Sequence, residues 1–297
     1  MSTASVAVAR PLANRRQTDV RSMIFVIALW ACLAMSAVFL FFVLAAIIRQ
    51  GVARFDSRLF SAAPSTIRPE RAGVEPAIFG TFWVIGMTAL IALPLGIAAA
   101  IYLEEYADPR RWYNRLVEVN IQNLAAVPAI IYGILTLAFV VRGPISIGAV
   151  ALAGAVALAL LILPVIIITT REALRAVPSE IRFGSLALGA TRWQTVWKQV
   201  LPSAVPGIAT GSILALSRAI GEAAPLILVG ATTFVTVNPD GPLDRYTVLP
   251  VQIFNLIPQD RQAFRDLAYA AILLLIIILL AMNALAIWLR NRYQRRW

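Results

Sequence analysis

The sequence predicts an all-α, polytopic membrane protein with six transmembrane helices, and three observations lead to this fold class. Of its 297 residues, 60% are hydrophobic and only 14% are charged, whereas an average soluble domain has about 25% charged residues. The apolar residues gather into six runs, each long enough to cross about 30 Å of hydrocarbon at about 1.5 Å per residue. The basic residues flank these runs, as in chains that cross a bilayer repeatedly.

The six runs define the predicted spans, and the segments between them define loops and tails. Residues 1–22 are predicted as a cytoplasmic N-terminal tail, 23–292 as the transmembrane domain and 293–297 as a cytoplasmic C-terminal tail. Prolines fall within four spans, where each removes a backbone hydrogen bond and favours a kink. The predicted spans are residues 23–48, 76–102, 120–141, 147–170, 204–235 and 267–289.

Basic residues are unevenly divided between the two predicted sides of the membrane. With the N-terminus inside, 16 of the 26 lie in inner segments, nine lie in outer segments, and Arg218 lies within a span. Because cytoplasmic loops are enriched in arginine and lysine, this division favours both termini in the cytoplasm. Residues 171–202 then form a cytoplasmic loop, and residues 236–266 form an outer loop. Within the outer loop, residues 248–257 are apolar but too short to span, so we expect an interfacial or re-entrant segment.

Counts of single residue types exclude several kinds of chemistry. There is no histidine, so no histidine base, catalytic triad or histidine metal site is possible. The single cysteine, Cys32, cannot form a disulfide within the chain. The single lysine, Lys198, is followed by Gln199, whereas a Walker A loop needs lysine followed by serine or threonine. We therefore expect no catalytic residue, metal or cofactor here, and any ATP that drives this chain must bind to another chain.

Arg218 and Glu222 lie one helical turn apart inside the fifth predicted span. An ionised side chain at the bilayer centre costs roughly 2.5–3.5 kcal/mol, so two of them require a reason. Their spacing places both on one helix face, where they can pair. Arginine grips phosphate and carboxylate groups in bidentate fashion, which favours an anion path; a structural ion pair between helices is the alternative. Pro225 should also free the carbonyl of Gly221, beside Glu222.

The loop 171–202 is predicted to contain two short helices. The first covers about residues 179–188 and ends at Gly189, a typical C-terminal glycine. The second begins at Thr191, and Gln194 completes the spacing of a capping box. We expect it to end before Pro202, because proline does not continue a helix.

The two short helices would expose a set of apolar and aromatic side chains. Such a helix–glycine–helix elbow can fill a groove on a partner protein. It can equally be an amphipathic hairpin on the membrane surface, and the pattern alone favours this second interpretation. The predicted exposed residues are Leu186, Leu188, Trp193, Val196 and Trp197.

The same loop resembles the coupling loop of permeases from ABC importers. That family has Glu-Ala-Ala, three residues, glycine, nine variable residues and then Ile-x-Leu-Pro. Gly189 matches the glycine, and Leu201 and Pro202 match the end, whereas residues 183–185 (Phe-Gly-Ser) replace Glu-Ala-Ala. The resemblance implies a type I ABC importer permease fold and a loop that enters a cleft on an ATP-binding subunit. The residues that it assigns to this coupling are Ser185, Leu186, Ala187, Leu188, Gly189, Ala190, Thr191, Arg192, Leu201 and Pro202.

Further stretches resemble the permeases of phosphate-specific (Pst) importers. The C-terminal run at residues 282–292 is more similar to PstA than to PstC permeases, and the resemblance covers roughly residues 75–292. The other matching stretches are residues 101–107, 123–133, 186–195 and 216–226.

The Pst resemblance implies a subunit of an ATP-driven inorganic phosphate importer in the bacterial inner or plasma membrane. Its implied partners are a PstC-like second permease subunit, a PstB-like ATPase dimer that binds ATP and Mg, and a PstS-like phosphate-binding protein. It also implies that the phosphate path includes Arg218 and Glu222, with Gly221 and Pro225 at the bend beside them. No covalent chemistry on phosphate is expected.

Three other functions stay open on the residues alone. The chain would serve equally as an ABC permease for sulfate, molybdate or phosphonate, since the same arginine suits each anion. A proton- or sodium-coupled secondary transporter, with Glu222 as proton carrier, is a second possibility. A membrane subunit that senses phosphate for a signalling kinase is a third.

Overall fold

The computed structural model describes residues 20–108, 110–231 and 235–293, which divide into two units. The predicted tails therefore fall almost entirely outside the described residues. The first unit, up to Ala46, contains most of α1 (Val20–Gly51), which matches the first predicted span. Within its most apolar stretch the helix buries none of its residues.

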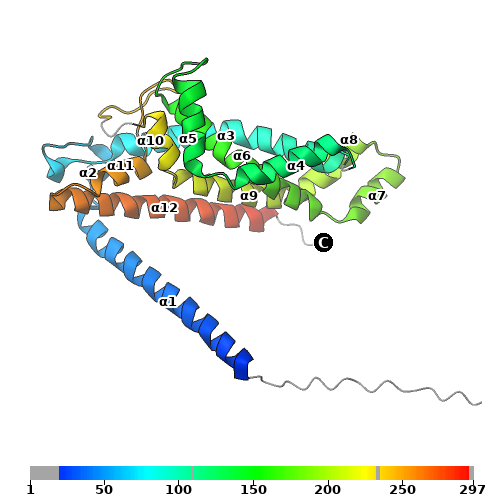
Figure 1. Cartoon of the computed structure of the whole chain (residues 1–297), viewed down its shortest axis with the longest axis horizontal. Coiled ribbons are helices and arrows are strands. Elements are labelled where there is room, and N and C mark those ends of the chain that lie inside the picture. Colours follow the sequence, from blue (N-terminus) through cyan, green and yellow to red (C-terminus); the bar gives the residue numbers. More distant parts are fainter. Residues whose placement is uncertain (1–19, 109, 232–234, 294–297) are drawn as a thin grey trace, which may run out of the picture. The chain divides into compact units, whose positions relative to one another are not determined.

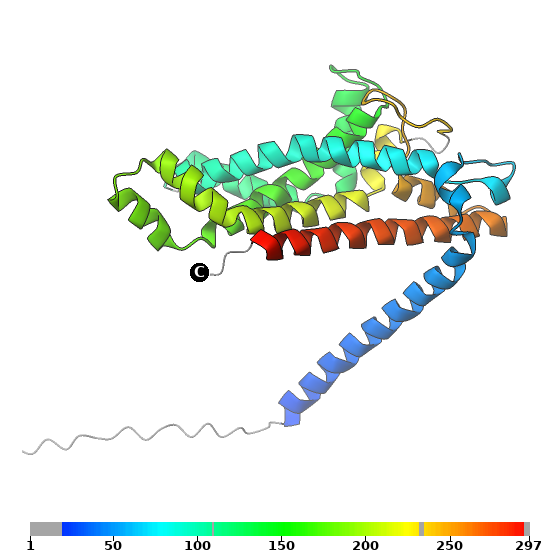
Figure 2. The same ribbon diagram turned by 180° about the vertical axis from the view of Figure 1, so that it is seen from behind.

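In the second unit, long helices of the predicted spans lie side by side (Figures 1 and 2). Two glycines at GxxxG spacing bring α9 close to α6, because a Cβ on Gly211 would lie 2.6 Å from that of Thr169 and one on Gly207 would lie 2.8 Å from that of Ala173. The helix that carries Arg218 is thereby fixed to the centre of this unit. The long helices are α3 (Glu75–Ile101), α6 (Ala151–Arg175), α9 (Leu201–Ile220) and α12 (Gln262–Tyr293).

The third predicted span is broken in the structure. Its two halves meet at an angle of 103°, just before Pro128. Tyr132, which is almost fully buried, donates a hydrogen bond of 2.7 Å across the break to the carbonyl of Leu124. Five described helices are long and apolar enough to span a membrane, and the number is six if the two halves count as one span. The halves are α4 (Trp112–Ala125) and α5 (Ala129–Thr136), which continues into the π-helical turn η4 (Leu137–Val141).

The fifth predicted span, residues 204–235, is wrong as one continuous helix. The helix α9 ends at Ile220, and the short helix α10 (Ala224–Val229) follows after a break. Residues 232–234 lie outside the described residues. The expected helix end before Pro202 is also wrong. Instead, α8 (Arg192–Thr195) continues through a π-helical turn, η5 (Val196–Val200), into α9, and Pro202 stands directly after the change from π-helical to α-helical turns.

Short elements close the two ends of the second unit (Figures 1 and 2). At one end, Arg54 bonds to the carbonyls of Pro69 and Ala72, and Asn238 bonds to Glu75 at the start of α3. The apolar segment 248–257, which is too short to span, forms a short helix there. This end contains η1 (Val52–Arg54), α2 (Ser57–Ser61), η2 (Pro69–Arg71) and α11 (Leu249–Leu256), and the other end contains η3 (Tyr102–Tyr106), α7 (Ser179–Ala187) and α8.

Candidate functional site

Arg218 and Glu222 pair as predicted, but across a helix end. Arg218 lies in the last turn of α9, and Glu222 lies two residues beyond its end. Their closest atoms, Arg218 Nε and Glu222 Oε1, are 3.7 Å apart, which is an ion pair without a hydrogen bond. The Arg218 side chain is 52% exposed and that of Glu222 is 25% exposed. Arg218 is therefore half-exposed in the single chain.

The break between α9 and α10 has a local cause. Gly221 N–H donates to the carbonyl of Arg218 and Glu222 N–H to that of Ala219, so the last turn of α9 tightens and closes. Pro225 stands in the first turn of α10, where its missing N–H costs nothing and its fixed φ favours a new helix. The predicted bend at this proline is thus present as a full interruption.

Neighbouring helices hold both sides of the break. A Cβ on Gly133 of α5 would lie 2.7 Å from the Cα of Pro225, so only glycine permits this approach. On α12, Asn283 Oδ1 accepts a hydrogen bond of 3.1 Å from the hydroxyl of Ser217. These contacts fix the backbone on either side of Arg218 and leave its guanidinium free of them.

The face of α9 that carries Arg218 is open in the single chain. Leu216 and Ala219 on the adjoining face are buried, whereas Leu214, one turn before Arg218, is 57% exposed. A guanidinium at bilayer depth is costly against lipid, so this face requires a polar partner surface or a water-filled path. A half-exposed arginine with a loosely held carboxylate offers free N–H donors to an oxyanion.

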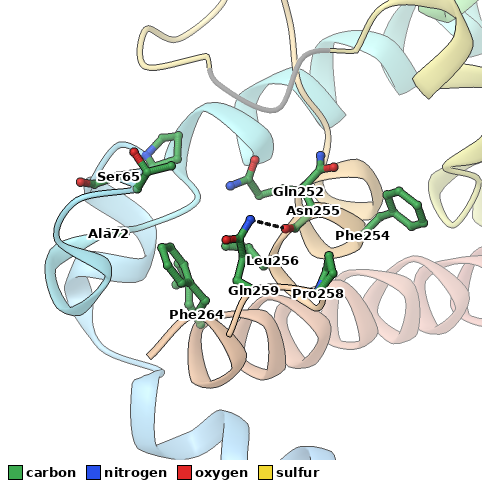
Figure 3. A pocket seen from close by; sticks show the side chains of 12 residues that line it. Ser65, Ala72, Gln252, Phe254, Asn255, Leu256, Pro258, Gln259 and Phe264 are labelled. Carbon is green, nitrogen blue, oxygen red and sulfur yellow. Dashed lines mark hydrogen bonds between the residues drawn. The ribbon is translucent and has the colours of Figure 1, made fainter. Parts of the chain in front are cut away.

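The pocket in Figure 3 provides no comparable site. It has a volume of about 240 Å³ and lies between the segment 64–72, α11 and the start of α12. Among the described residues that line it, none is charged; Gln259 there donates to the carbonyl of Asn255. An anion would find amides and apolar side chains but no opposite charge, so the α9 break is the better candidate.

The helix–glycine–helix elbow of the loop 171–202 is confirmed. Gly189 separates α7 from α8 with φ of +84°, a left-handed conformation that favours glycine. Thr191 and Gln194 form both bonds of the predicted capping box. Ser185 and Thr195 join the two short helices through a hydroxyl contact of 2.9 Å.

The elbow presents most of the predicted apolar surface. Leu188 is 90% exposed, Trp193 is 60% exposed, and Leu186 and Trp197 are also exposed. The expectation for Val196 is wrong, because it is only 1% exposed and faces inward from the π-helical turn. The remaining predicted coupling residues divide into an exposed set, Ala187, Gly189, Thr191, Arg192 and Pro202, and a half-buried set, Ser185, Ala190 and Leu201.

The sequence analysis missed a charge cluster at the α7 end of the unit. It joins acidic residues of η3 and α4 to arginines of α6 and α7. The adjacent acids Glu104 and Glu105 at the end of a span are the signal that could have found it, but their partners lie more than 60 residues away. Its members are Glu104, Glu105, Glu118, Arg171, Arg175 and Arg182.

These features define a class: a multi-pass membrane permease with an interrupted, charge-bearing helix and an exposed elbow at one end. The sequence profile described as "Binding-protein-dependent transport system inner membrane component" matches residues 92–297. The chain belongs to this family.

Two relatives illustrate the similarity. The "Probable ABC transporter permease protein YqgI" of Bacillus subtilis is 33% identical over 273 residues, with 87% of this chain and 91% of the relative covered. The "Phosphate transport system permease protein PstA 1" of Mycobacterium tuberculosis H37Rv is 35% identical over 233 residues, with 77% and 74% covered.

Solved structures share the fold at lower identity. A chain of a bacterial alginate ABC transporter, in complex with an alginate-bound periplasmic protein, has a TM-score of 0.67 at 18% identity, covering 95% of this chain and 99% of that one. A chain of the MetNI methionine ABC transporter has a TM-score of 0.55 at 21% identity, covering 75% and 95%. The predicted fold class, an ABC importer permease, is confirmed.

Proposed function

We propose that this chain is a membrane-spanning permease subunit of an ATP-driven importer of inorganic phosphate and forms half of the translocation path. The observation that carries the proposal is the half-exposed Arg218 at the α9 break, held by a single carboxylate at 3.7 Å. The PstA relatives, which are named as permeases of phosphate transport systems, support this choice of anion.

In this proposal, Arg218 forms a transient site for phosphate. Its guanidinium offers paired N–H donors, and Glu222 holds it when no anion is present. Glu222 can also accept a hydrogen bond from the protonated oxygen of monohydrogen phosphate. A site in a transport path must release its cargo, so partial neutralisation by Glu222 keeps binding weak.

The proposed partners follow from the family and from the exposed elbow. A PstC-like permease subunit covers the open face of α9, and a PstS-like binding protein delivers phosphate at the α11 end. A PstB-like ATPase dimer receives the elbow and holds ATP and Mg, so this chain needs no cofactor of its own. The α7 end and both termini then lie in the cytoplasm, and the chain lies in the bacterial inner or plasma membrane.

Uptake by the reconstituted complex tests the proposal. We expect vesicles that contain this chain, its second permease subunit, the ATPase and the binding protein to accumulate labelled phosphate only with ATP. Excess unlabelled phosphate should compete, whereas sulfate, molybdate and phosphonate should not. Competition by one of those anions would reassign the cargo, and uptake by this chain alone under a proton or sodium gradient would identify a secondary transporter.

A further inference from the structure

One part of the charge cluster ties three elements together at the α7 end. Glu104 accepts hydrogen bonds from Arg171 Nε at 3.1 Å and from Arg175 Nε at 2.8 Å, and Arg171 also pairs with Glu118 of α4 at 3.0 Å. The Arg171 side chain is only 11% exposed. These bonds connect η3, α4 and the end of α6, all within the membrane domain, and leave α7 untouched.

One ion pair of the cluster reaches into the loop. Arg182 of α7 donates to Glu105 Oε1 from Nη2 at 2.8 Å and from Nε at 3.3 Å. The same guanidinium donates to the carbonyls of Leu174 and Val177, each at 2.7 Å, at the end of α6. Glu105 is 7% exposed, so this is a largely desolvated pair with satisfied partners.

Arg182 is the charged anchor of α7. Within the described chain, no residue of this helix is fully buried, and its apolar contact is the half-buried Ile181, which packs against the cluster that contains Leu174 and Val177. Ser185 joins α7 only to α8, which belongs to the same elbow. The guanidinium fork therefore fixes α7 to η3 and α6 at once, a task for which arginine is better suited than lysine.

The position of Glu105 connects this anchor to α3. Glu105 lies on η3, which follows α3 without interruption, and α3 packs along α6. A displacement of the elbow therefore reaches α3 through Arg182 and Glu105, beside the backbone connection to α6 and the Arg192 guanidinium, which lies 5.6 Å over the ring of Tyr106 in η3. Because the pair is short and mostly buried, and the same guanidinium bonds to two carbonyls, it resists separation of α7 from η3.

We infer that Arg182 and Glu105 form the joint through which the coupling elbow moves α3, with Arg182 as a positioning residue. The inference rests on the proposed function, since a moving elbow requires an ATPase partner. Loss of the joint should leave ATP hydrolysis in place and separate it from transport.

The first test measures phosphate transported per ATP hydrolysed in the reconstituted complex. We expect Arg182→Gln to lower this ratio about tenfold, within the usual range of coupling between sites, with near-normal ATP hydrolysis. Glu105→Gln keeps the shape and an acceptor oxygen, so it should assemble and lower the ratio less. The matched control, Arg175→Gln, removes a cluster bond that does not touch α7 and should keep the ratio. Unchanged ratios in both joint variants would overturn the inference, whereas parallel losses of transport and hydrolysis would indicate a merely structural role.

The second test does not depend on the cargo. Spin labels at Glu180 on α7 and Tyr102 on η3, both exposed, would report the distance across the joint, with Cys32 replaced by serine. In the complex that retains Arg182, the distance distribution between the two labels should be the same with and without ATP. In the Arg182→Gln complex, this distribution should broaden or shift when ATP is added. A shift with ATP in the labelled complex that retains Arg182 would overturn the joint. Absence of phosphate uptake with an unchanged distance would overturn only the proposed function.

Discussion

The α9 break and the charge cluster contain the same residue types, arginine and glutamate, and differ in how completely the arginine is bonded. At the break, Arg218 has one partner at 3.7 Å and is 52% exposed. In the cluster, Arg182 donates to one carboxylate and two carbonyls at 2.7–2.8 Å. The first arrangement leaves the N–H donors of Arg218 free on an open face, whereas in the second four of the five N–H donors of Arg182 are bonded.

This difference separates a binding role from a structural one. A multiply bonded, mostly buried arginine cannot bind a mobile anion without breaking several charge-assisted bonds, each worth about 1.5–3 kcal/mol. An exposed pair is worth only about 0.2–1 kcal/mol, so an anion displaces Glu222 at little cost. The degree of bonding, more than the presence of charge, therefore identifies Arg218 as the candidate anion site.

The largest expected effect is the loss of the free guanidinium. Arg218→Ala should lower phosphate uptake by more than about 100-fold, because two charge-assisted hydrogen bonds to the anion disappear. The complex should still assemble, since no hydrogen bond of the described residues depends on this side chain. Uptake of labelled phosphate and co-purification of the partner subunits measure the two outcomes.

The exposed Arg142, directly after η4, supplies the matched control. Arg142→Ala removes an equal charge away from the break and should retain uptake. Normal uptake by Arg218→Ala would refute the anion site, and equal losses in the two variants would point to net charge instead.

A smaller effect is expected at the hinge of the elbow. Gly189→Ala forces a side chain into the left-handed region at φ of +84°, which costs about 1–2 kcal/mol and should lower phosphate transported per ATP by about tenfold. Gly184→Ala is the control, because a Cβ there would meet no described atom within 4 Å and the glycine has no positive φ. If both variants transport the same amount of phosphate per ATP, the left-handed geometry at Gly189 is not needed for coupling.

Patterns among residues close in sequence predicted much of this structure, whereas contacts between residues far apart in sequence could not be predicted. The capping box at Thr191 and the glycine hinge depend on neighbours in sequence, so both were predictable. Proline was an ambiguous signal: Pro94 and Pro164 lie inside continuous helices, whereas the helix is interrupted at Pro128. The break there is supported by the Tyr132 hydroxyl, a tertiary contact that hydropathy does not contain.

The candidate site shows the same limit. Hydropathy identified Arg218 and Glu222 as unusual, and their spacing predicted the pair. Pro225 predicted a bend, but the continuous apolar run concealed the complete end of α9 at Ile220, where the last turn closes on its own carbonyls. Arg182 and Glu105 are 77 residues apart, and no periodicity relates them.

The smallest expected effect concerns the weak partner of Arg218. Glu222→Gln removes a competing charge worth at most about 1 kcal/mol. The phosphate concentration that gives half-maximal uptake should therefore fall by up to about fivefold. Because Glu222 then no longer neutralises part of the charge on Arg218, phosphate should dissociate more slowly, and the maximal rate of uptake should fall by a similar factor. Uptake measured over a range of phosphate concentrations separates the two changes. Glu172→Gln, which alters an exposed carboxylate at the end of α6, should change neither quantity. If Glu222→Gln leaves the half-saturating phosphate concentration unchanged and stops uptake altogether, Glu222 does more than partly neutralise Arg218. A proton-coupled mechanism requires such an additional role.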